Sequence, residues 1–515
     1  MAQRTWNWNY SAFSKPAQNV APATKGALRD IVTKTNQFPS PLRAVGEVHS
    51  MNSCFATTGT HVSMEKLSAV GNPVKDEARG IWLVTAQAGA TMFDIRQKLR
   101  QHNPPLELEV SPEIGNATVG SSACCGTKDA SLGTGPGQIS SIAERILLMD
   151  ANGNDVELTL GSEDLRWARC SYGLMGVVQE ATFRARPLAP LDYEYHWFPA
   201  DAALTRAKVF GGADGVLAFL QPYRKRIMVE RRTRVADPAT AANRIADTRV
   251  RREIRDWVWQ WGATQSVALA PILAEAFSQN LPSQLVAMLL DSAATAFDHP
   301  FLNNPLVRTA LNVVRSSLNL GGVTTDQALA AADKLPEPLF ELLEGYTAHR
   351  SDSMINFTHD RQTYFEFTFW AFPQDDWEKL LPLYLKFCED FHRDTGFRAS
   401  LFTEIYFIAK DESSPLSFSL DAPIFTLDMV DHRPWDPRWQ QLNERYNEWA
   451  AAHGGRPLLN QTKRLEATPG VVAKAFKAAG ALGQNWDAFR QRVTEKDPSG
   501  RFRNEFFDRL LKESA

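Results

Sequence analysis

A single histidine stands where a predicted strand turns through a glycine. Residues 42–50 read Leu-Arg-Ala-Val-Gly-Glu-Val-His-Ser, so an apolar run leads through Gly46 to His49. A histidine in such a place can be a ligand, a base, a point of covalent attachment, or an ordinary hydrogen-bonded loop residue. The stretch alone favours the loop residue, and the other segments of the chain have to decide.

A glutamate stands among aromatic side chains in a second stretch. Residues 399–408 have the alternation of a strand, which puts Glu404 and Tyr406 on the same face. A carboxylate there is costly unless it is paired or functional, so a structural ion pair is the alternative to a catalytic role. Residues 364–372 alternate in the same way with phenylalanines, and two aromatic strands suit the floor of an apolar pocket.

Small residues dominate the segment 114–142, which holds six glycines and few large side chains. Such a segment lets the backbone approach a ligand closely, and its N–H groups can cradle an anion such as a pyrophosphate. A glycine-rich surface loop is the alternative. The segment leads directly into a strand predicted at 146–149 and a turn at 150–153, which favours a place beside a sheet. No GxGxxG or Walker lysine pattern accompanies it, so neither a Rossmann nor a P-loop site is indicated.

The elements around these residues predict more than one domain, because 515 residues are too many for one core. Before residue 190, predicted strands alternate with short helices, which indicates an α+β or α/β layer fold. The strands lie at 81–86 and 178–183, and the helices at 27–32 and 92–99. Prolines at 187–190 mark a boundary. Beyond it we predict an exposed strand at 227–235, a helical block at 240–350, a helix at 377–391 and a strand at 425–431.

Composition disfavours several classes of protein. The net charge of −3 and the pI near 6.4 argue against a nucleic-acid partner. Five cysteines, two of them adjacent, make neither a disulfide framework nor a zinc site, so we predict no metal. The N-terminal residues lack the apolar core of a secretory signal. The uncharged run at 257–274 is a poor membrane span, which we interpret as a buried helix, so we predict no membrane span and a cytoplasmic protein.

Four segments, taken in order, resemble those of a known family. They are Gly-x-x-His-Ser at 46–50, the glycine-rich segment, Asp-Ala-Asn-Gly at 150–153 and Gly-Leu-Met-Gly-Val-Val at 173–178. This order resembles the PCMH-type FAD-binding domain of the vanillyl-alcohol oxidase flavoprotein family, with the aldonolactone and alditol oxidases most similar, over residues 5–190. The resemblance implies bound FAD, with its pyrophosphate held by backbone of the first two segments. It also implies a covalent bond from His49 to the flavin 8α-methyl.

The FAD contacts that the resemblance implies gather in the same segments. They are His49, Gly46, Glu47, Val48, Ser50, Gly120, Ser121, Ser122, Gly126, Thr127, Ile142, Gly176 and Val178. One departure is visible. The lactone oxidases read Gly-Thr-His-Gly where this chain continues from Thr127 with Lys128 and Asp129, so the edge of the implied flavin site is altered.

The second half of the chain resembles the cap domain of the same oxidases. Their cap strand reads Glu-x-Arg, and its glutamate orients and activates the substrate hydroxyl. Glu404 matches the glutamate, whereas Tyr406 replaces the arginine, which favours a less polar substrate. Residues 455–457 match part of a Gly-Arg-Pro-His-Trp-Gly-Lys segment, so Lys463 is a candidate catalytic lysine, with a solvated lysine as the alternative. Residues 497–504 match a C-terminal Asp-Pro-x-Gly-x-Phe-x-Asn pattern.

We therefore predict an α+β fold with two domains. An FAD-binding domain spans 1–190, and a substrate-binding cap domain with a large antiparallel sheet, flanking helices and a helical insertion spans 191–455. The segment 456–515 is predicted to return to the FAD domain.

The resemblance implies an FAD-dependent oxidoreductase that oxidises a C–OH group of a small alcohol, polyol or lactone by hydride transfer to flavin N5. Dioxygen is the expected acceptor, with hydrogen peroxide as second product, and Glu404, Tyr406 and Lys463 are the expected catalytic residues. One alternative is a dehydrogenase that oxidises a larger apolar alcohol or sterol and passes electrons to another acceptor. A second is a flavin-binding protein without catalysis.

Overall fold

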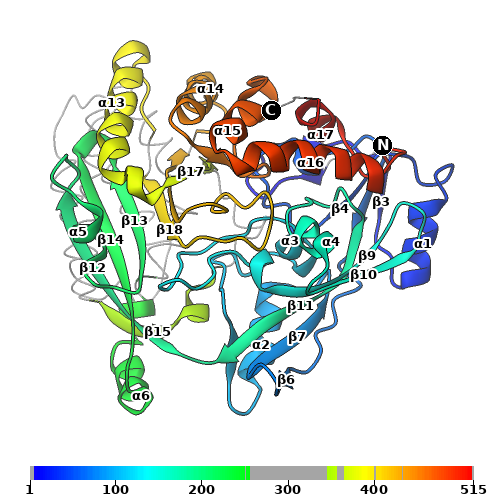
Figure 1. The fold of residues 1–515 in the computed structure, drawn as a ribbon, viewed down its shortest axis with the longest axis horizontal. Helices are drawn as coiled ribbons and strands as arrows, with labels where there is room; N and C mark the ends of the chain where they lie inside the picture. The colour runs from blue at the N-terminus through cyan, green and yellow to red at the C-terminus, as the bar shows by residue number, and fades with distance from the viewer. Residues whose placement is uncertain are drawn as a thin grey trace, which may run out of the picture.

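Two units that differ in their sheets make up the described part of the chain (Figure 1). The computed structural model describes residues 5–249, 251–253, 255, 345–355, 365–399, 402–431 and 433–512. Most of the helical block predicted at 240–350 lies outside these residues, as does the whole of the buried helix predicted at 257–274.

The first unit contains a small parallel sheet and a larger antiparallel sheet. The parallel order is β3–β5–β4, with β3 at Gln18–Val20, β4 at Leu42–Val45 and β5 at Thr60–Ser63. The antiparallel order is β10–β9–β11–β7–β6, and β8 pairs with β11. These strands are β6 Val74–Asp76, β7 Ile81–Gln87, β8 Leu106–Leu108, β9 Ala143–Met149, β10 Asp155–Thr159 and β11 Val177–Pro187. The strands predicted from the sequence in this half are confirmed.

Short helices cover these sheets, and local chemistry fixes where they begin. The helix α2, at Met92–Arg100, begins at a capping box in which Thr91 and Asp94 bond each other's backbone. Its buried residues Ile95 and Leu99 are one turn apart, as the pattern predicted. The other helices here are α1 Lys25–Thr33, α3 Val119–Cys124 and α4 Glu163–Ala168. The helix α3 thus begins inside the glycine-rich segment and packs against β11 and β7.

The second unit is organised by a ten-stranded antiparallel sheet, so the predicted α+β class with a large antiparallel sheet is confirmed. Its order is β15–β12–β14–β13–β18–β19–β17–β21, and β20 lies between β18 and β16. The strands are β12 Pro190–Pro199, β13 Gly215–Gln221, β14 Arg226–Arg234, β15 Tyr346–His349, β16 Glu366–Thr368, β17 Trp370–Pro373, β18 Thr403–Ile408, β19 Ile424–Thr426, β20 Asp428–Asp431 and β21 Arg456–Pro457.

Three details of this sheet correct the sequence-based prediction. The strand predicted at 364–372 is divided into β16 and β17, and the strand predicted at 425–431 is divided into β19 and β20. The reason is that the sheet forks: β18 pairs with β19 at one end and with β20 at the other. The strand β14 was predicted to be exposed, but Ile227, Met228 and Val229 are fully buried, because β14 lies between β12 and β13.

Helices of the second half cover one face of the sheet. The helices are α5 Arg206–Phe210, α6 Pro238–Asp247, α13 Trp377–Thr395 and α14 Pro437–Ala452. The Tyr384 hydroxyl of α13 lies 2.7 Å from Thr403 Oγ1 of β18, so α13 packs on the face that Thr403 occupies. Nowhere in the described ranges is there a helix with both the length and the apolar run needed to cross a membrane.

The last segment contacts the beginning of the chain (Figure 1). It forms α15 Val471–Ala478, α16 Ala481–Lys496 and α17 Glu505–Leu510. Arg501 donates to the carbonyl of Ile31 at 2.7 Å and to that of Val32 at 3.0 Å, which are at the C-terminal end of α1. The Asn504 amide donates to the carbonyls of Ser53, Cys54 and Ala56. These contacts are those expected of a segment that returns to the first domain, while the domain boundaries stay a prediction.

Candidate active site

The loop that carries His49 lies directly against the glycine-rich segment. A Cβ at Gly46 would lie 2.2 Å from Thr118 Oγ1 and 2.9 Å from Ser121 Oγ, so any other residue there would displace these side chains. Two residues later, Val48 has a φ of +51°, a left-handed conformation that is costly for a β-branched residue. His49 Nε2 lies 3.0 Å from Asn116 Oδ1. The two segments predicted to hold the FAD pyrophosphate are therefore neighbours.

Close backbone packing continues behind this loop. A Cβ at Gly120 would lie 3.1 Å from the Ala88 side chain, and one at Gly176, where φ is +146°, would lie 2.6 Å from the Met149 carbonyl oxygen. The Ser122 hydroxyl is buried and has no hydrogen-bond partner among the described residues. These glycines let neighbouring backbone segments pack closely. The buried Ser122 hydroxyl is an unsatisfied polar group of the kind that a phosphate-bearing cofactor can satisfy, so this region fits FAD.

The other predicted FAD contacts occupy three different environments. Glu47 is exposed, and the Ser50 carbonyl accepts a hydrogen bond from Asn7. Ile142 and Val178 are buried in the apolar core of the first unit. Gly126 approaches the side chains of Phe418 and Leu458, and Thr127 bonds the backbone of Ile139, so this end of the segment reaches the second unit. The structure thus brings Gly46 and His49 together with residues near α3, and places Gly126 near Phe418 and Leu458.

One face of the large sheet carries a row of polar side chains. Directly paired residues of neighbouring strands point to the same face, and alternate residues of a strand do so as well. Glu404 pairs with Asp428 of β20 and with Phe219 of β13, while Tyr406 pairs with Leu217. Leu217 in turn pairs with Glu230 of β14. The row is formed by Tyr195, Glu230, Arg232, Glu404, Tyr406 and Asp428.

Glu404 and Tyr406 meet a third residue that the sequence did not reveal. The Tyr406 hydroxyl donates to Glu113 Oε2 at 3.0 Å and lies 3.4 Å from Glu404 Oε2. Glu113 belongs to the first unit and lies just before α3, so the two carboxylates come from different units and share one phenol. Local sequence around Glu113 contains no signal for this role, because its partner is 293 residues away.

The surroundings of Glu404 favour its protonated form. Burial, followed by the nearby carboxylates of Glu113 and Asp428, raises the pKa of Glu404 to about 8. Lys128 and the Tyr406 hydroxyl act in the opposite direction. Burial also raises the pKa of Glu113. A carboxyl group whose pKa lies near neutrality can exchange a proton with a bound molecule at ordinary pH.

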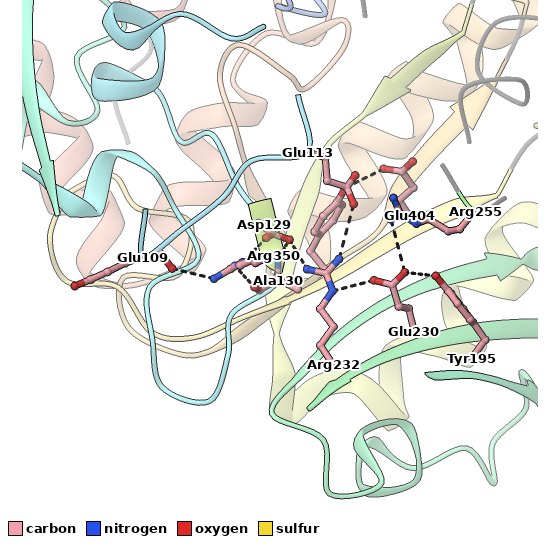
Figure 2. A network of polar contacts seen from close by, with 11 residues as sticks. Glu109, Glu113, Asp129, Ala130, Tyr195, Glu230, Arg232, Arg255, Arg350 and Glu404 are labelled. Atoms are coloured by element: carbon pink, nitrogen blue, oxygen red, sulfur yellow. Dashed lines mark hydrogen bonds and ion pairs between the residues drawn. The ribbon is translucent and has the colours of Figure 1, made fainter. Parts of the chain in front are cut away.

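A cluster of buried ion pairs joins the two units behind this site (Figure 2). Asp129 accepts from Arg232 at 2.8 Å and from Arg350 at 2.6 Å. Arg232 also donates to Glu230 at 2.8 Å, and Glu230 accepts from the Tyr195 hydroxyl at 2.8 Å. Although burial opposes the ionisation of Asp129, the guanidinium groups of Arg350 and Arg232 hold its pKa below the usual range. Asp129 therefore links the glycine-rich segment to the ten-stranded sheet.

Lys463, the third predicted catalytic residue, lies elsewhere. Its Nζ donates to Glu366 Oε1 at 2.7 Å, and Trp439 of α14 donates to Glu366 Oε2 at 2.7 Å. Glu366 pairs with Asp431, which is three residues from Asp428 in β20 and so points to the opposite face. The structure brings Glu404 and Tyr406 together, and it places the Lys463 ammonium group with Glu366 and not with Glu404.

Comparison with known proteins finds similarity over the first third of the sequence and over the whole fold. Residues 16–159 match a family model described as an FAD binding domain. A stretch of 190 residues is 29% identical to an L-gulono-1,4-lactone dehydrogenase of Mycobacterium tuberculosis (strain H37Rv) and covers 36% of this chain and 41% of that protein. The chain thus matches about two fifths of the length of that relative.

Two solved cholesterol oxidase structures are similar over nearly the whole chain. A cholesterol oxidase of Brevibacterium sterolicum has a TM-score of 0.66 at 15% sequence identity, over 99% of this chain and 97% of that one. A solvent-stable cholesterol oxidase has a TM-score of 0.68 at 15% identity, with the same coverage. At this identity the similarity concerns the fold.

Proposed function

We propose that this protein, whose FAD-binding domain is of the PCMH type found in the vanillyl-alcohol oxidase family, is an FAD-dependent oxidoreductase that oxidises a C–OH group of a small organic molecule. The family resemblance supports FAD as the cofactor, and the matched residues 16–159 include the His49 loop and the glycine-rich segment. FAD, when bound, supplies the acceptor for the hydride that leaves the carbinol carbon.

The observation that carries the proposed chemistry is the carboxyl of Glu404, buried beside Tyr406 on the sheet face that meets the first unit. As a carboxylate, Glu404 accepts the proton of the substrate hydroxyl while the C–H bond breaks. When a substrate binds, the Tyr406 hydroxyl turns from Glu113 and donates its hydrogen bond to the reacting oxygen, which becomes the oxygen of the new carbonyl group. Without substrate, its hydrogen bond to Glu113 at 3.0 Å keeps the hydroxyl on this face of the sheet. We give Lys463 no part in this proton transfer, because its ammonium group is held by Glu366.

His49 is the proposed point of covalent attachment to the flavin. Its place after Gly46, next to the glycine-rich segment, supports this assignment, and Asn116 at 3.0 Å orients the imidazole. An attached flavin would be fixed in position and would be a stronger oxidant. Dioxygen is the proposed acceptor, which gives hydrogen peroxide.

The aromatic surroundings of Tyr406 favour a second candidate substrate class. Phe367 and Phe369 lie near the ring of Tyr406 around the same ammonium group, and an arginine is replaced by a phenol at position 406. A larger apolar alcohol or sterol fits such walls better than a polyol does. The similarity in fold to a cholesterol oxidase supports this substrate class. The similarity to a lactone dehydrogenase supports an electron acceptor other than dioxygen for this second candidate.

Two measurements on the purified protein test the proposal. Acid precipitation asks whether yellow colour stays with the pellet, and His49→Ala should release it to the supernatant. Anaerobic mixing with a panel of polyols, lactones, aliphatic alcohols and sterols should then bleach the flavin with at least one member. Oxygen uptake measured beside dye reduction separates oxidase from dehydrogenase. If no alcohol reduces the flavin, and the Glu404→Gln variant gives the same result, the protein binds flavin without catalysing this reaction.

A further inference from the structure

Two departures from the lactone oxidase patterns meet in space. Lys128 stands where those oxidases have a histidine, and Tyr406 stands where they have an arginine. The two residues are 278 positions apart, yet the Lys128 ammonium lies 4.5 Å from the centroid of the Tyr406 ring. The chain therefore lacks a positive charge at position 406 and has one directly beside it.

The Lys128 side chain is enclosed by the same sheet face as Glu404. Its Nζ lies 3.0 Å from Asp428 Oδ2, and only 9% of the lysine side chain is exposed. The rings of Phe369 and Phe367 lie 5.0 and 5.7 Å from the ammonium, close enough for cation–π attraction. Asp428 is the direct cross-strand partner of Glu404, so the ammonium is held beside the catalytic carboxyl as well as beside its own partner.

The backbone on either side of Lys128 is fixed, which keeps its side chain on this face. Lys128 forms a β-bridge with Gln138, and the next residue, Asp129, is bound by Arg232 and Arg350. A lysine with a free choice of rotamers would place its ammonium in water. The fixed backbone instead holds the charge near Glu404 when the two units are assembled.

The groups around Glu404 differ in sign. Asp428 comes from β20 and Glu113 from the segment before α3, and both oppose a negative charge on Glu404. Tyr406 of the same strand and Lys128 favour it. The neighbouring strand β13 contributes Phe219 and Leu217, which are apolar. Beyond them, Glu230 of β14 is paired with Arg232 at 2.8 Å and with Arg255 at 3.7 Å, and Arg232 also lies 3.9 Å from Glu113 (Figure 2).

We propose that Lys128 is the positioning cation of this site: it stabilises the carboxylate form of Glu404 and supplies the positive charge that is absent at position 406. The inference rests on the proposed function for its catalytic meaning, since Glu404 must lose its proton before it can accept one. A purely structural Lys128–Asp428 pair would hold the units together without changing how Glu404 titrates.

Thermal stability against pH measures that titration without any turnover. A carboxyl group with a raised pKa in the folded state contributes stability that is present at low pH and is lost as pH rises through the folded pKa. The stability advantage of Glu404→Gln over the unaltered protein should therefore grow from mildly acidic pH and stop growing near pH 8, where Glu404 has ionised. In a Lys128→Met background that point should move up by about 1 pH unit, the smaller end of the shift expected for a nearby opposite charge.

The pH dependence of kcat/KM gives the second readout. Its acidic limb should move up by the same amount in Lys128→Met, and Lys128→Arg should restore it. Lys386→Gln, which removes an exposed lysine of α13 paired with Asp390, is the matched control and should leave both readouts unchanged. If Lys128→Met does not fold, Lys128→Gln in an Asp428→Asn background leaves no unpaired carboxylate, and its shift relative to Asp428→Asn alone isolates Lys128.

The inference would be overturned if Lys128→Met changed neither the pH at which the stability advantage of Glu404→Gln stops growing nor the acidic limb of kcat/KM. It would also be overturned if Lys386→Gln shifted both by the same amount. The proposed function fails in a different way: no alcohol would reduce the flavin in the unaltered protein. In that case, a shift of the pH at which the stability advantage stops growing would still show that Lys128 stabilises the Glu404 carboxylate. Only the catalytic role of that carboxylate would be lost.

Discussion

Two buried lysine–carboxylate pairs lie on opposite faces of the same forked region of the sheet, and they differ in what surrounds them. Lys463 and Glu366, at 2.7 Å, lie on the face covered by helices. Lys128 and Asp428, at 3.0 Å, lie on the face that meets the first unit. Both pairs join a buried lysine to a buried carboxylate, so the residue types do not distinguish them.

The neighbours of each pair distinguish them. Trp439 donates to the second oxygen of Glu366, Thr368 accepts from the backbone N–H of Lys463, and Asn447 donates to its carbonyl, so this pair is enclosed by completed hydrogen bonds. Around Lys128 and Asp428 lie two further carboxyl groups, and burial raises the pKa of Asp428 to about 6 even though Lys128 opposes the change. A satisfied ion pair is suited to hold a fold, whereas a crowded one is suited to change protonation.

The largest expected effect comes from Glu404→Gln, which removes the proposed base from the face that carries Lys128 and Asp428. We expect flavin reduction by the best alcohol to slow by about 10²- to 10⁴-fold, the usual contribution of a positioned base. Rapid-mixing absorbance under anaerobic conditions measures this directly. Glu65→Gln, on an exposed residue, is the control. A rate within about twofold of the unaltered protein would remove Glu404 from the mechanism.

Breaking the Lys463–Glu366 pair should lower the stability of the protein and leave its catalytic rate unchanged. Lys463→Met leaves Glu366 buried without its cation, so we expect the free energy of unfolding to fall by about 3 kcal/mol, the lower part of the range for breaking a buried pair. Denaturant titration measures the loss, and the protein that remains folded should keep the pH dependence of kcat/KM. A stable variant with strongly reduced turnover would instead support the catalytic role that the sequence predicted for Lys463.

Neutralising Glu113 or Asp428 should change the pKa of Glu404 in the direction opposite to the loss of Lys128. Both carboxylates raise the pKa of Glu404, which stands at about 8, so Glu113→Gln and Asp428→Asn should each lower it. The acidic limb of kcat/KM should then begin about 1 pH unit lower. An unchanged acidic limb in either variant would mean that the replaced carboxyl group is uncharged in the working protein, and an upward shift would contradict the prediction.

The smallest expected effect belongs to Tyr406→Phe. It deletes the hydroxyl that bonds Glu113 and lies near Glu404, and leaves the ring that contacts Lys128. A lost hydrogen bond costs roughly 1 kcal/mol, so kcat/KM should fall by about fivefold, with a small upward shift of the acidic limb. Steady-state kinetics against pH measures both quantities. An unchanged kcat/KM would restrict Tyr406 to packing.

The sequence predicted the local elements well and the contacts between distant elements poorly. Glycine and alternation patterns act over a few residues, so the β4 loop, α2 and the shared face of Glu404 and Tyr406 were predicted correctly. Glu113 and Arg232 carry no such pattern, because register and the fork of the sheet, and not local sequence, bring them together. Lys128 was visible as a departure from a family pattern, but its neighbour Asp428 was not.

The contacts of Arg501 and Asn504 with the beginning of the chain can form only late in translation. Asn504 bonds the carbonyl of Cys54, 450 residues earlier, and Arg501 bonds the end of α1. At roughly 5–20 residues per second, a ribosome needs about 20 to 90 s between making Cys54 and making Asn504. Throughout that interval the loop after β4 lacks partners that it has in the finished chain. We therefore expect the flavin to be captured late, after translation has passed Asn504, and the nascent first unit to depend on protection from aggregation until then.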